Sequence, residues 1–170
     1  RIHKATVRDR VLHHAMFNVL NQIYEPTFIS DSYSCRINKG THKGMKRVVE
    51  MIRAVSKNNT HPCYALKCDI KKFFDSIDHC ILINILNERI KDEKVRSLLR
   101  EVVGSFEAGR TNLFEPKGVP IGNLTSQIFA NIYMDRFDQF IKHTLKVKNY
   151  ARYTDDFVIV SDDRVYLENL

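Results

Sequence analysis

Hydrophobic residues recur at helical spacing in several stretches of the chain. Between Val7 and Tyr24 they fall three or four positions apart, which predicts an amphipathic helix that Pro26 helps to end. The same spacing predicts a second helix from about Thr41 to Val55. Further helices are predicted over about residues 78–90, 92–103 and 124–145.

Shorter apolar stretches are typical of strands. Cys63–Ile70 reads as a strand that ends in a carboxylate, whereas Gly104–Val119 reads as a hairpin or loop. Tyr150–Tyr153 and Phe157–Ser161 read as two strands of a hairpin with acids at its tip. Helices and strands do not alternate regularly, so the order predicts an α+β fold with an antiparallel sheet.

Composition and charge narrow the class of protein. The chain has 170 residues, of which 44% are hydrophobic and 28% charged, as in a globular protein of one domain or two small lobes. No apolar run is long enough to cross a bilayer, so a membrane partner is not expected. The net charge of +7 favours phosphate-bearing partners, although many basic proteins bind no nucleic acid.

The four cysteines do not indicate a metal site. They form no CxxC pair, and no pair of histidines completes a zinc pattern. Reduced thiols in or near a core are the expected state, which suits a cytoplasmic protein.

Three acids stand at the ends of apolar strands: Asp69, Asp155 and Asp156. An unpaired buried carboxylate is costly, and carboxylates brought together repel each other unless a cation lies between them. Mg²⁺ suits such a site, and two such ions about 4 Å apart can drive phosphoryl transfer. The alternative is a chance doublet, because Asp162–Asp163 is another such pair, which reads as a solvated turn.

Several motifs resemble those of bacterial reverse transcriptases, in the same order. Residues 65–79 resemble the first catalytic motif, and Tyr153–Asp156 resembles the Tyr-x-Asp-Asp box. Residues 118–127 resemble the motif that opens the template-contacting helix, and residues 5–10, 32–36 and 40–42 resemble motifs of the fingers. The resemblance covers nearly the whole chain and includes enzymes of group II introns.

This resemblance implies a right-hand polymerase palm, an antiparallel sheet packed on helices, with part of the fingers. The fingers are expected over residues 1–62, and the palm over 63–170 with inserted fingers helices at about 78–116. The thumb is expected to be absent, as in a fragment of a longer protein that polymerises poorly by itself. The implied partners are an RNA template, a DNA or RNA primer, deoxynucleoside triphosphates (dNTPs) and an accessory protein.

The resemblance also implies roles for individual residues. Asp69 and Asp155 are expected to bind two Mg²⁺ ions, for which Mn²⁺ could substitute, with the backbone carbonyl of Ile70 assisting. Asp156 is expected to be a catalytic residue and a weaker or outer ligand, with a structural acid at the hairpin tip as the alternative. Phe74 is placed under the incoming sugar, where a ring would exclude a ribose 2′-hydroxyl.

Two further assignments depend on the resemblance. Arg8 is expected to reach the triphosphate, although a solvated helix face is the default for a lone arginine. One of Phe73 and Phe74 is expected in the core instead, because adjacent residues point different ways.

The chain departs from the common pattern at Ile121–Gly122, where many reverse transcriptases have Gln-Gly next to the incoming nucleotide. The run from Ile121 to Gln127 resembles diversity-generating retroelement enzymes, which copy adenines with poor fidelity. We expect Ile121 to loosen base selection in the same way. An RNA-dependent RNA polymerase of similar palm and a non-catalytic nucleic-acid-binding protein remain alternatives.

Overall fold

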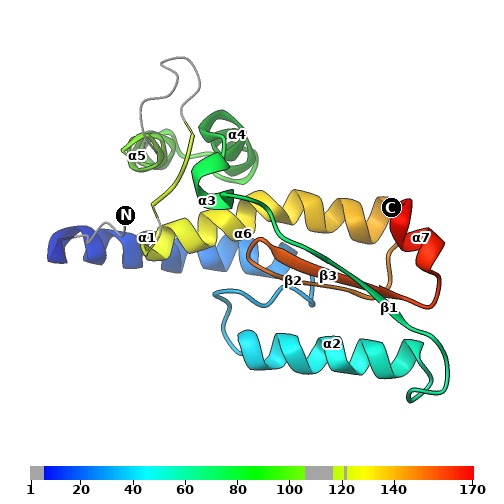
Figure 1. Ribbon diagram of the computed structural model, residues 1–170. Coiled ribbons are helices and arrows are strands. Elements are labelled where there is room, and N and C mark those ends of the chain that lie inside the picture. Colours follow the sequence, from blue (N-terminus) through cyan, green and yellow to red (C-terminus); the bar gives the residue numbers. More distant parts are fainter. Residues whose placement is uncertain (1–5, 106–116, 121) are drawn as a thin grey trace. The chain divides into compact units, whose positions relative to one another are not determined.

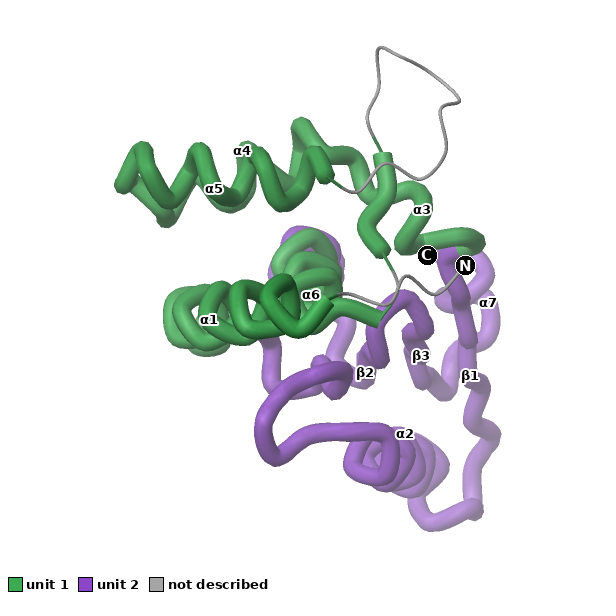
Figure 2. The backbone as a smooth tube through the Cα atoms, turned by 90° about the vertical axis from the view of Figure 1, so that its left-hand side faces the viewer, with its two compact units in different colours: residues 1–27, 71–134 green, residues 28–70, 135–170 purple. Residues whose placement is uncertain are grey.

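The described residues form helices and one three-stranded sheet. The computed structural model describes residues 6–105, 117–120 and 122–170 (Figure 1). Packing divides the chain into two compact units: residues 1–27 and 71–134 form unit 1, and residues 28–70 and 135–170 form unit 2 (Figure 2). These units differ from the expected fingers and palm because those bounds follow motifs rather than packing. The bounds 1–62 and 63–170 therefore stay a prediction.

Unit 1 is helical, and polar caps fix where its helices begin. Helix α1 (Val7–Tyr24) starts at a capping box, in which the side chains of Thr6 and Asp9 bond each other's backbone N–H. The side chain of Asp78 caps α4 (His79–Arg89), and that of Asp92 caps α5 (Glu93–Gly104). The unit also holds the short helix α3 (Phe73–Ser76) and the start of α6 (Leu124–Gln139), and the 3₁₀ turn η1 (Glu25–Thr27) follows α1.

Two buried side chains of helix α1 form polar contacts with other helices of unit 1. The ring Nδ1 of His13 lies 2.8 Å from the hydroxyl of Thr125 in α6, and both side chains are buried. The hydroxyl of Tyr24 donates to the carbonyl of Leu86 in α4 at 3.2 Å. These contacts give α1 a fixed register against α4 and α6.

Unit 2 is built on a three-stranded antiparallel sheet in the order β1-β3-β2. Its strands are β1 (Tyr64–Cys68), β2 (Tyr150–Tyr153) and β3 (Asp156–Ser161). The unit also holds α2 (Thr41–Val55), the π-helix η2 (Phe140–Thr144) and α7 (Arg164–Glu168). Strands β2 and β3 form a hairpin, and β3 continues beyond its far end into α7 (Figure 1).

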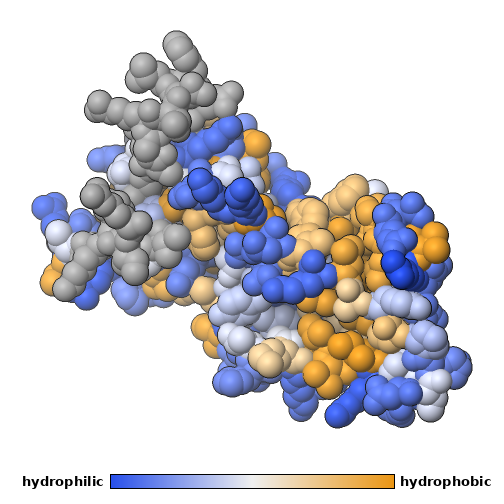
Figure 3. Space-filling model, viewed as in Figure 1, coloured by the Kyte–Doolittle hydropathy of each residue, from blue (hydrophilic) through white to orange (hydrophobic). Residues whose placement is uncertain are grey.

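Successive side chains of each strand point to opposite faces of the sheet, so the sheet contributes to two hydrophobic cores. One core contains Tyr150 and Ile159 and is covered by η2, α7 and the end of α6 through Ile141, Leu167 and Phe137. The other contains Ala151, Val158 and Val160 and is covered by Met51 of α2 and by Tyr33. Figure 3 shows hydrophobic side chains gathered where α2 meets the sheet. The sheet is therefore packed on both faces, which restricts the movement of its strands and of the loop between β2 and β3.

The predicted α+β fold is confirmed, and the helices α1 and α2 have the expected bounds. The single helix predicted over 124–145 is wrong at its end. Helix α6 stops at Gln139, and η2 continues with the N–H of Leu145 bonded to the carbonyl of Phe140, five residues back. Helices α3 and α7 were not predicted, and residues 106–116 of the predicted loop lie outside the described residues. In the part that is described, no helix combines the length and apolar character needed to span a bilayer.

Candidate active site

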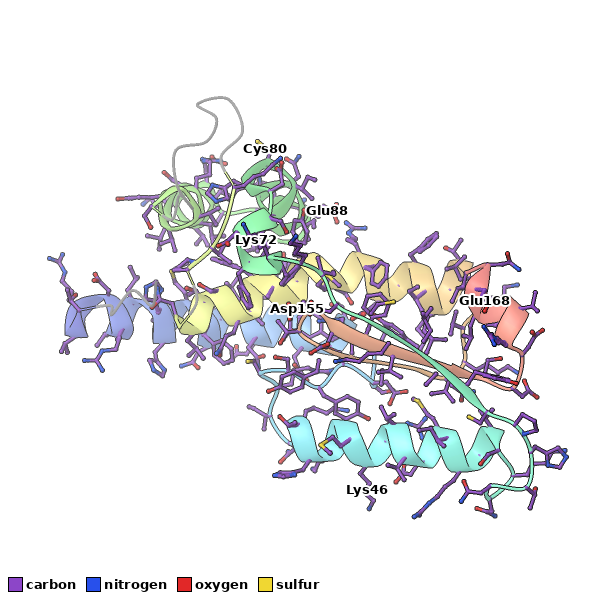
Figure 4. All side chains as sticks on the ribbon, in the orientation of Figure 1. Lys46, Lys72, Cys80, Glu88, Asp155 and Glu168 are labelled. Atoms are coloured by element: carbon purple, nitrogen blue, oxygen red, sulfur yellow. The ribbon has the colours of Figure 1, made fainter. Side chains whose placement is uncertain are left out.

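Two neighbouring strands bring their acidic ends to one edge of the sheet in unit 2. In the antiparallel register, Cys68 at the end of β1 pairs with Phe157 in β3. Asp69 directly follows Cys68, and Asp156 directly precedes Phe157, so the two acids occupy adjacent positions of the same ladder. Asp155 lies at the tip of the hairpin (Figure 4). Acids far apart in sequence thus meet at one end of the sheet.

The hairpin loop is as short as a hairpin allows. Tyr153 pairs with Asp156, so only Thr154 and Asp155 form the loop. Thr154 has a φ of 58°, in the left-handed region that two-residue hairpin loops require at their first position. The tight loop limits the positions that the Asp155 carboxylate can reach.

The electrostatics of Asp155 indicate a site that favours a cation. Burial raises the pKa of Asp155, and the negative charges of Asp69 and Asp156 raise it further, while a backbone hydrogen bond and the charge of Arg152 oppose the shift. Asp69 and Asp156 thus shift the pKa of Asp155 in the same direction as burial does. Because like charges are held together, a divalent cation between them would be stabilised.

Asp156 has a cationic partner within the protein. Its Oδ1 atom lies 3.3 Å from Nζ of Lys67 in β1, and both side chains are substantially exposed. Among the described residues, no group of three or more His, Cys, Asp or Glu side chains could hold a metal ion. The available ligands are the carboxylates of Asp69 and Asp155 and a nearby backbone carbonyl oxygen. This set fits Mg²⁺, which is bound by one or two carboxylates together with waters and substrate phosphates. The role of Asp156 as an outer ligand stays a prediction.

The other expected residues lie on both units. Ile70 follows Asp69 in unit 2, while Phe74 and Arg8 belong to unit 1. Phe73 is only 3% exposed and Phe74 is half-buried, with their ring centroids 5.4 Å apart, so Phe73 is the core aromatic. Arg8 is exposed in the first turn of α1. The structure leaves the nucleotide contacts of Phe74, Arg8 and Ile70 as predictions.

The segment before α6 is anchored to the α3–α4 region within unit 1. The N–H of Val119 donates to the carbonyl of Phe74, and the N–H of Gly118 to that of Ile77, each at 2.8 Å. Nε2 of His79 lies 2.6 Å from the carbonyl oxygen of Gly118. Gly122 has a φ of 111°, a conformation that favours glycine. Ile121 lies outside the described residues, so its expected effect on base selection stays a prediction.

Sequence reasoning missed a buried polar network beneath the hairpin. Arg152 in β2 and Asp138 in α6 form an ion pair of 2.7 Å, and both side chains are fully buried. The hydroxyl of Tyr150 donates to the same carboxylate at 2.6 Å. A usable signal was present, because an arginine inside an apolar strand requires a buried acid as its partner.

A family model described as reverse transcriptase (RNA-dependent DNA polymerase) matches residues 1–170. The chain belongs to the reverse transcriptase family. This reverse transcriptase chain is 30% identical over 144 residues to the group II intron-encoded protein LtrA of Lactococcus lactis subsp. cremoris. The aligned region covers 84% of the chain and 23% of LtrA. It is 27% identical over 139 residues to protein YkfC of Escherichia coli, covering 79% of the chain and 35% of YkfC.

A solved structure shares the fold of this reverse transcriptase chain. The apo telomerase of Candida tropicalis superposes with a TM-score of 0.65 at 12% sequence identity, over 94% of this chain and 33% of the telomerase. Such a low identity supports the fold alone. The chain thus spans about a third or less of the lengths of these three proteins.

Proposed function

We propose that this chain is the catalytic part of an RNA-directed DNA polymerase, which adds deoxynucleotides to a primer 3′-hydroxyl on an RNA template. One observation carries the proposal: the register of β1, β3 and β2 puts Asp69 at the same edge of the sheet as the hairpin loop that holds Asp155, in a chain that the family model matches throughout. A carboxylate pair at this edge has no structural benefit, because the charges repel each other.

The carboxylates are proposed to hold two Mg²⁺ ions, with Mn²⁺ as a substitute, and the carbonyl of Ile70 adds a neutral oxygen. When bound, the ions would lower the pKa of the primer hydroxyl and neutralise charge on the triphosphate. The 3′-hydroxyl gives its proton to solvent water, and its oxygen forms a bond to the α-phosphorus of the dNTP. The bond from that phosphorus to the bridging oxygen breaks, and pyrophosphate leaves.

Asp155 has the main part in this scheme because the two-residue loop restricts its carboxylate. Placement and charge account for most of the acceleration in phosphoryl transfer, since the protein forms no covalent intermediate. Asp156 is proposed as an outer ligand, whose carboxylate would exchange its ion pair with Lys67 for one with a divalent cation. The ion pair with Lys67 is exposed and therefore weak enough to be replaced.

The remaining residues are proposed to select and bind the nucleotide. The half-buried ring of Phe74 is the surface on which a deoxyribose would lie. The exposed guanidinium of Arg8 is available to a triphosphate, which its planar donors suit. The proposed partners are the RNA template, a DNA or RNA primer and an accessory protein, in the cytoplasm.

Primer extension by the full-length protein tests the proposal. With poly(rA)/oligo(dT), Mg²⁺ and labelled dTTP, Asp155→Asn keeps the side-chain shape but removes the charge. We expect extension to fall to about one hundredth or less of the wild-type rate. Replacing dTTP with UTP distinguishes DNA synthesis from RNA synthesis.

Asp162→Asn is the matched control, because Asp162 is exposed and follows the opposite end of β3. It makes the same chemical change in the same unit, and we expect wild-type extension. If Asp155→Asn extends the primer as well as Asp162→Asn does, the proposed function is wrong.

The enzyme is proposed to come from a diversity-generating or related bacterial retroelement, because Ile121 and the residues that follow it resemble reverse transcriptases of that subgroup. Its test is misincorporation opposite template adenines by the wild type and by Ile121→Gln. We expect fewer errors in the variant, because glutamine restores a hydrogen bond to the nascent pair. Equal error rates would remove the argument for this subgroup.

A further inference from the structure

The loop that presents Asp155 requires support from outside itself. The first position of a two-residue hairpin loop is usually glycine, asparagine or aspartate, because φ is positive there. Here the position holds Thr154, a β-branched residue with a φ of 58°. Such a conformation is strained for threonine and persists only where the surroundings fix it.

Two side chains of unit 2 fix Thr154 from different sides. Nη1 of Arg152 donates to the carbonyl oxygen of Thr154 at 2.8 Å. The hydroxyl of Thr154 donates to the hydroxyl of Ser34 at 2.6 Å. Both the backbone and the side chain of the strained residue are therefore held, directly before Asp155.

Arg152 is itself held rigidly. Its Nε and Nη2 atoms donate to the two carboxylate oxygens of Asp138 at 2.8 and 2.7 Å, and Nη2 also donates to the hydroxyl of Ser32 at 3.1 Å. The backbone N–H of Arg152 donates to the carbonyl of Asp31, and the N–H of Tyr33 donates to the carbonyl of Arg152, each at 2.9 Å. With its side chain fully buried, the guanidinium has one available position.

We propose that Arg152 is a positioning residue for the active site, which with Ser34 holds the Thr154 loop in the conformation that lets Asp155 bind divalent cations. It acts through the Thr154 carbonyl and does not touch substrate. The inference rests on the proposed function, because it takes Asp155 as a metal ligand. Arginine suits this role, since its planar guanidinium binds Asp138 through Nε and Nη2 while Nη1 donates to the loop carbonyl, whereas the single amine of lysine cannot make both sets of contacts.

The first test compares Arg152→Lys with the wild-type full-length protein. Mn²⁺ binding without nucleotide, measured by electron paramagnetic resonance, should weaken about tenfold, as is usual when a residue that orients a metal ligand is changed. The Mg²⁺ concentration for half-maximal primer extension should rise by a similar factor, while the KM for dNTP at saturating Mg²⁺ changes little. Hydrogen exchange of the 152–157 amides in the metal-free protein should become faster.

Leu167→Ala is the control for a purely structural role. Leu167 packs in the core cluster of the same sheet that also contains Tyr150, on α7 beyond the far end of β3. Its aliphatic side chain cannot form a hydrogen bond to Arg152, Ser34 or Thr154. It should lower stability and leave Mn²⁺ binding unchanged. If Arg152→Lys binds Mn²⁺ as tightly as the wild type does, or if Leu167→Ala weakens binding equally, the inference is overturned.

A rescue makes the test specific to the loop. Glycine adopts a positive φ without strain, so Thr154→Gly added to Arg152→Lys should recover part of the Mn²⁺ affinity. Further loss in the double variant would count against the inference. If Arg152→Lys does not fold, Ser34→Ala replaces it: a loss of about threefold in Mn²⁺ affinity supports the inference, and wild-type affinity overturns it.

The outcomes separate this inference from the proposed function. If Asp155→Asn abolishes Mn²⁺ binding and extension while Arg152→Lys behaves as wild type, only the positioning role fails. If Asp155→Asn retains both, the proposed function fails as well.

Discussion

Removal of one hydroxyl, by Tyr150→Phe, measures how strongly the buried network stabilises the sheet. The Tyr150 side chain is completely buried, and its hydroxyl donates to Oδ1 of Asp138 at 2.6 Å. The ring remains in the variant, so its packing against Phe137 and Phe157 is kept, with centroid separations of 6.5 and 6.0 Å. The change therefore isolates one hydrogen bond.

The magnitude follows from the charge and burial of the acceptor. A hydrogen bond to a charged group contributes about 1.5–3 kcal/mol, and water cannot replace the lost donor because the Asp138 side chain is fully buried. Arg152 still donates two hydrogen bonds to the carboxylate, so we expect a loss in the middle of this range, about 2 kcal/mol. Burial, and then the charge of Asp138, raise the pKa of Tyr150 above its ordinary 10.0. This contribution is therefore complete below pH 10 and is lost only at higher pH.

Native-state hydrogen exchange of the full-length protein gives the opening free energy of residues 150–161 directly. We expect exchange there to be faster in Tyr150→Phe by roughly thirtyfold, which corresponds to about 2 kcal/mol. Tyr166→Phe is the control, because Tyr166 is 39% exposed on α7, and it should change the opening free energy by less than about 0.5 kcal/mol. A loss below about 0.5 kcal/mol in Tyr150→Phe would refute the reasoning.

Three other predictions concern unit 1. Burial lowers the pKa of His13 despite the opposing charge of Asp9, so its contribution to stability is complete above the ordinary pKa of 6.5 and is lost as pH falls from there through the lowered pKa. In His13→Gln the thermal midpoint should therefore change less between pH 7 and 5 than it does in the wild type. Leu86→Ala should cost about 2–5 kcal/mol in urea unfolding, because Leu86 is 0% exposed, whereas Ile81→Ala at a half-exposed position of α4 should cost under about 1 kcal/mol. Phe74→Val should raise the ratio of UTP to dTTP incorporation in primer extension, and an unchanged ratio would contradict the proposed role of this ring.

The elements that could be predicted from the sequence are those with a local pattern. Helix α1 has its cap and its apolar stripe within one stretch, so both ends followed from residues 6–26. Strands β2 and β3 were predicted because polar residues separate two apolar runs. In contrast, α3 and α7 have only four and five residues, too few to show a helical period.

The candidate site was predicted only in part for a related reason. The motif residues Asp69 and Asp155 follow strands that can be recognised locally. The partners that fix the hairpin come from two separate segments. Ser34 is 120 residues from Thr154 in the sequence, and Asp138 is 14 residues from Arg152. Such contacts depend on tertiary packing, which hydrophobic periodicity does not encode.

Calorimetric or resonance titration of the full-length protein with Mn²⁺ tests most directly whether Asp69 and Asp155 hold the same cations. Each of Asp69→Asn and Asp155→Asn should weaken binding by about tenfold or more, and Asp162→Asn should not. If both carboxylates bind the same ions, the double variant Asp69→Asn/Asp155→Asn should lose little more affinity than the single variant that loses more affinity. Fully additive losses, or wild-type affinity in Asp155→Asn, would contradict the account.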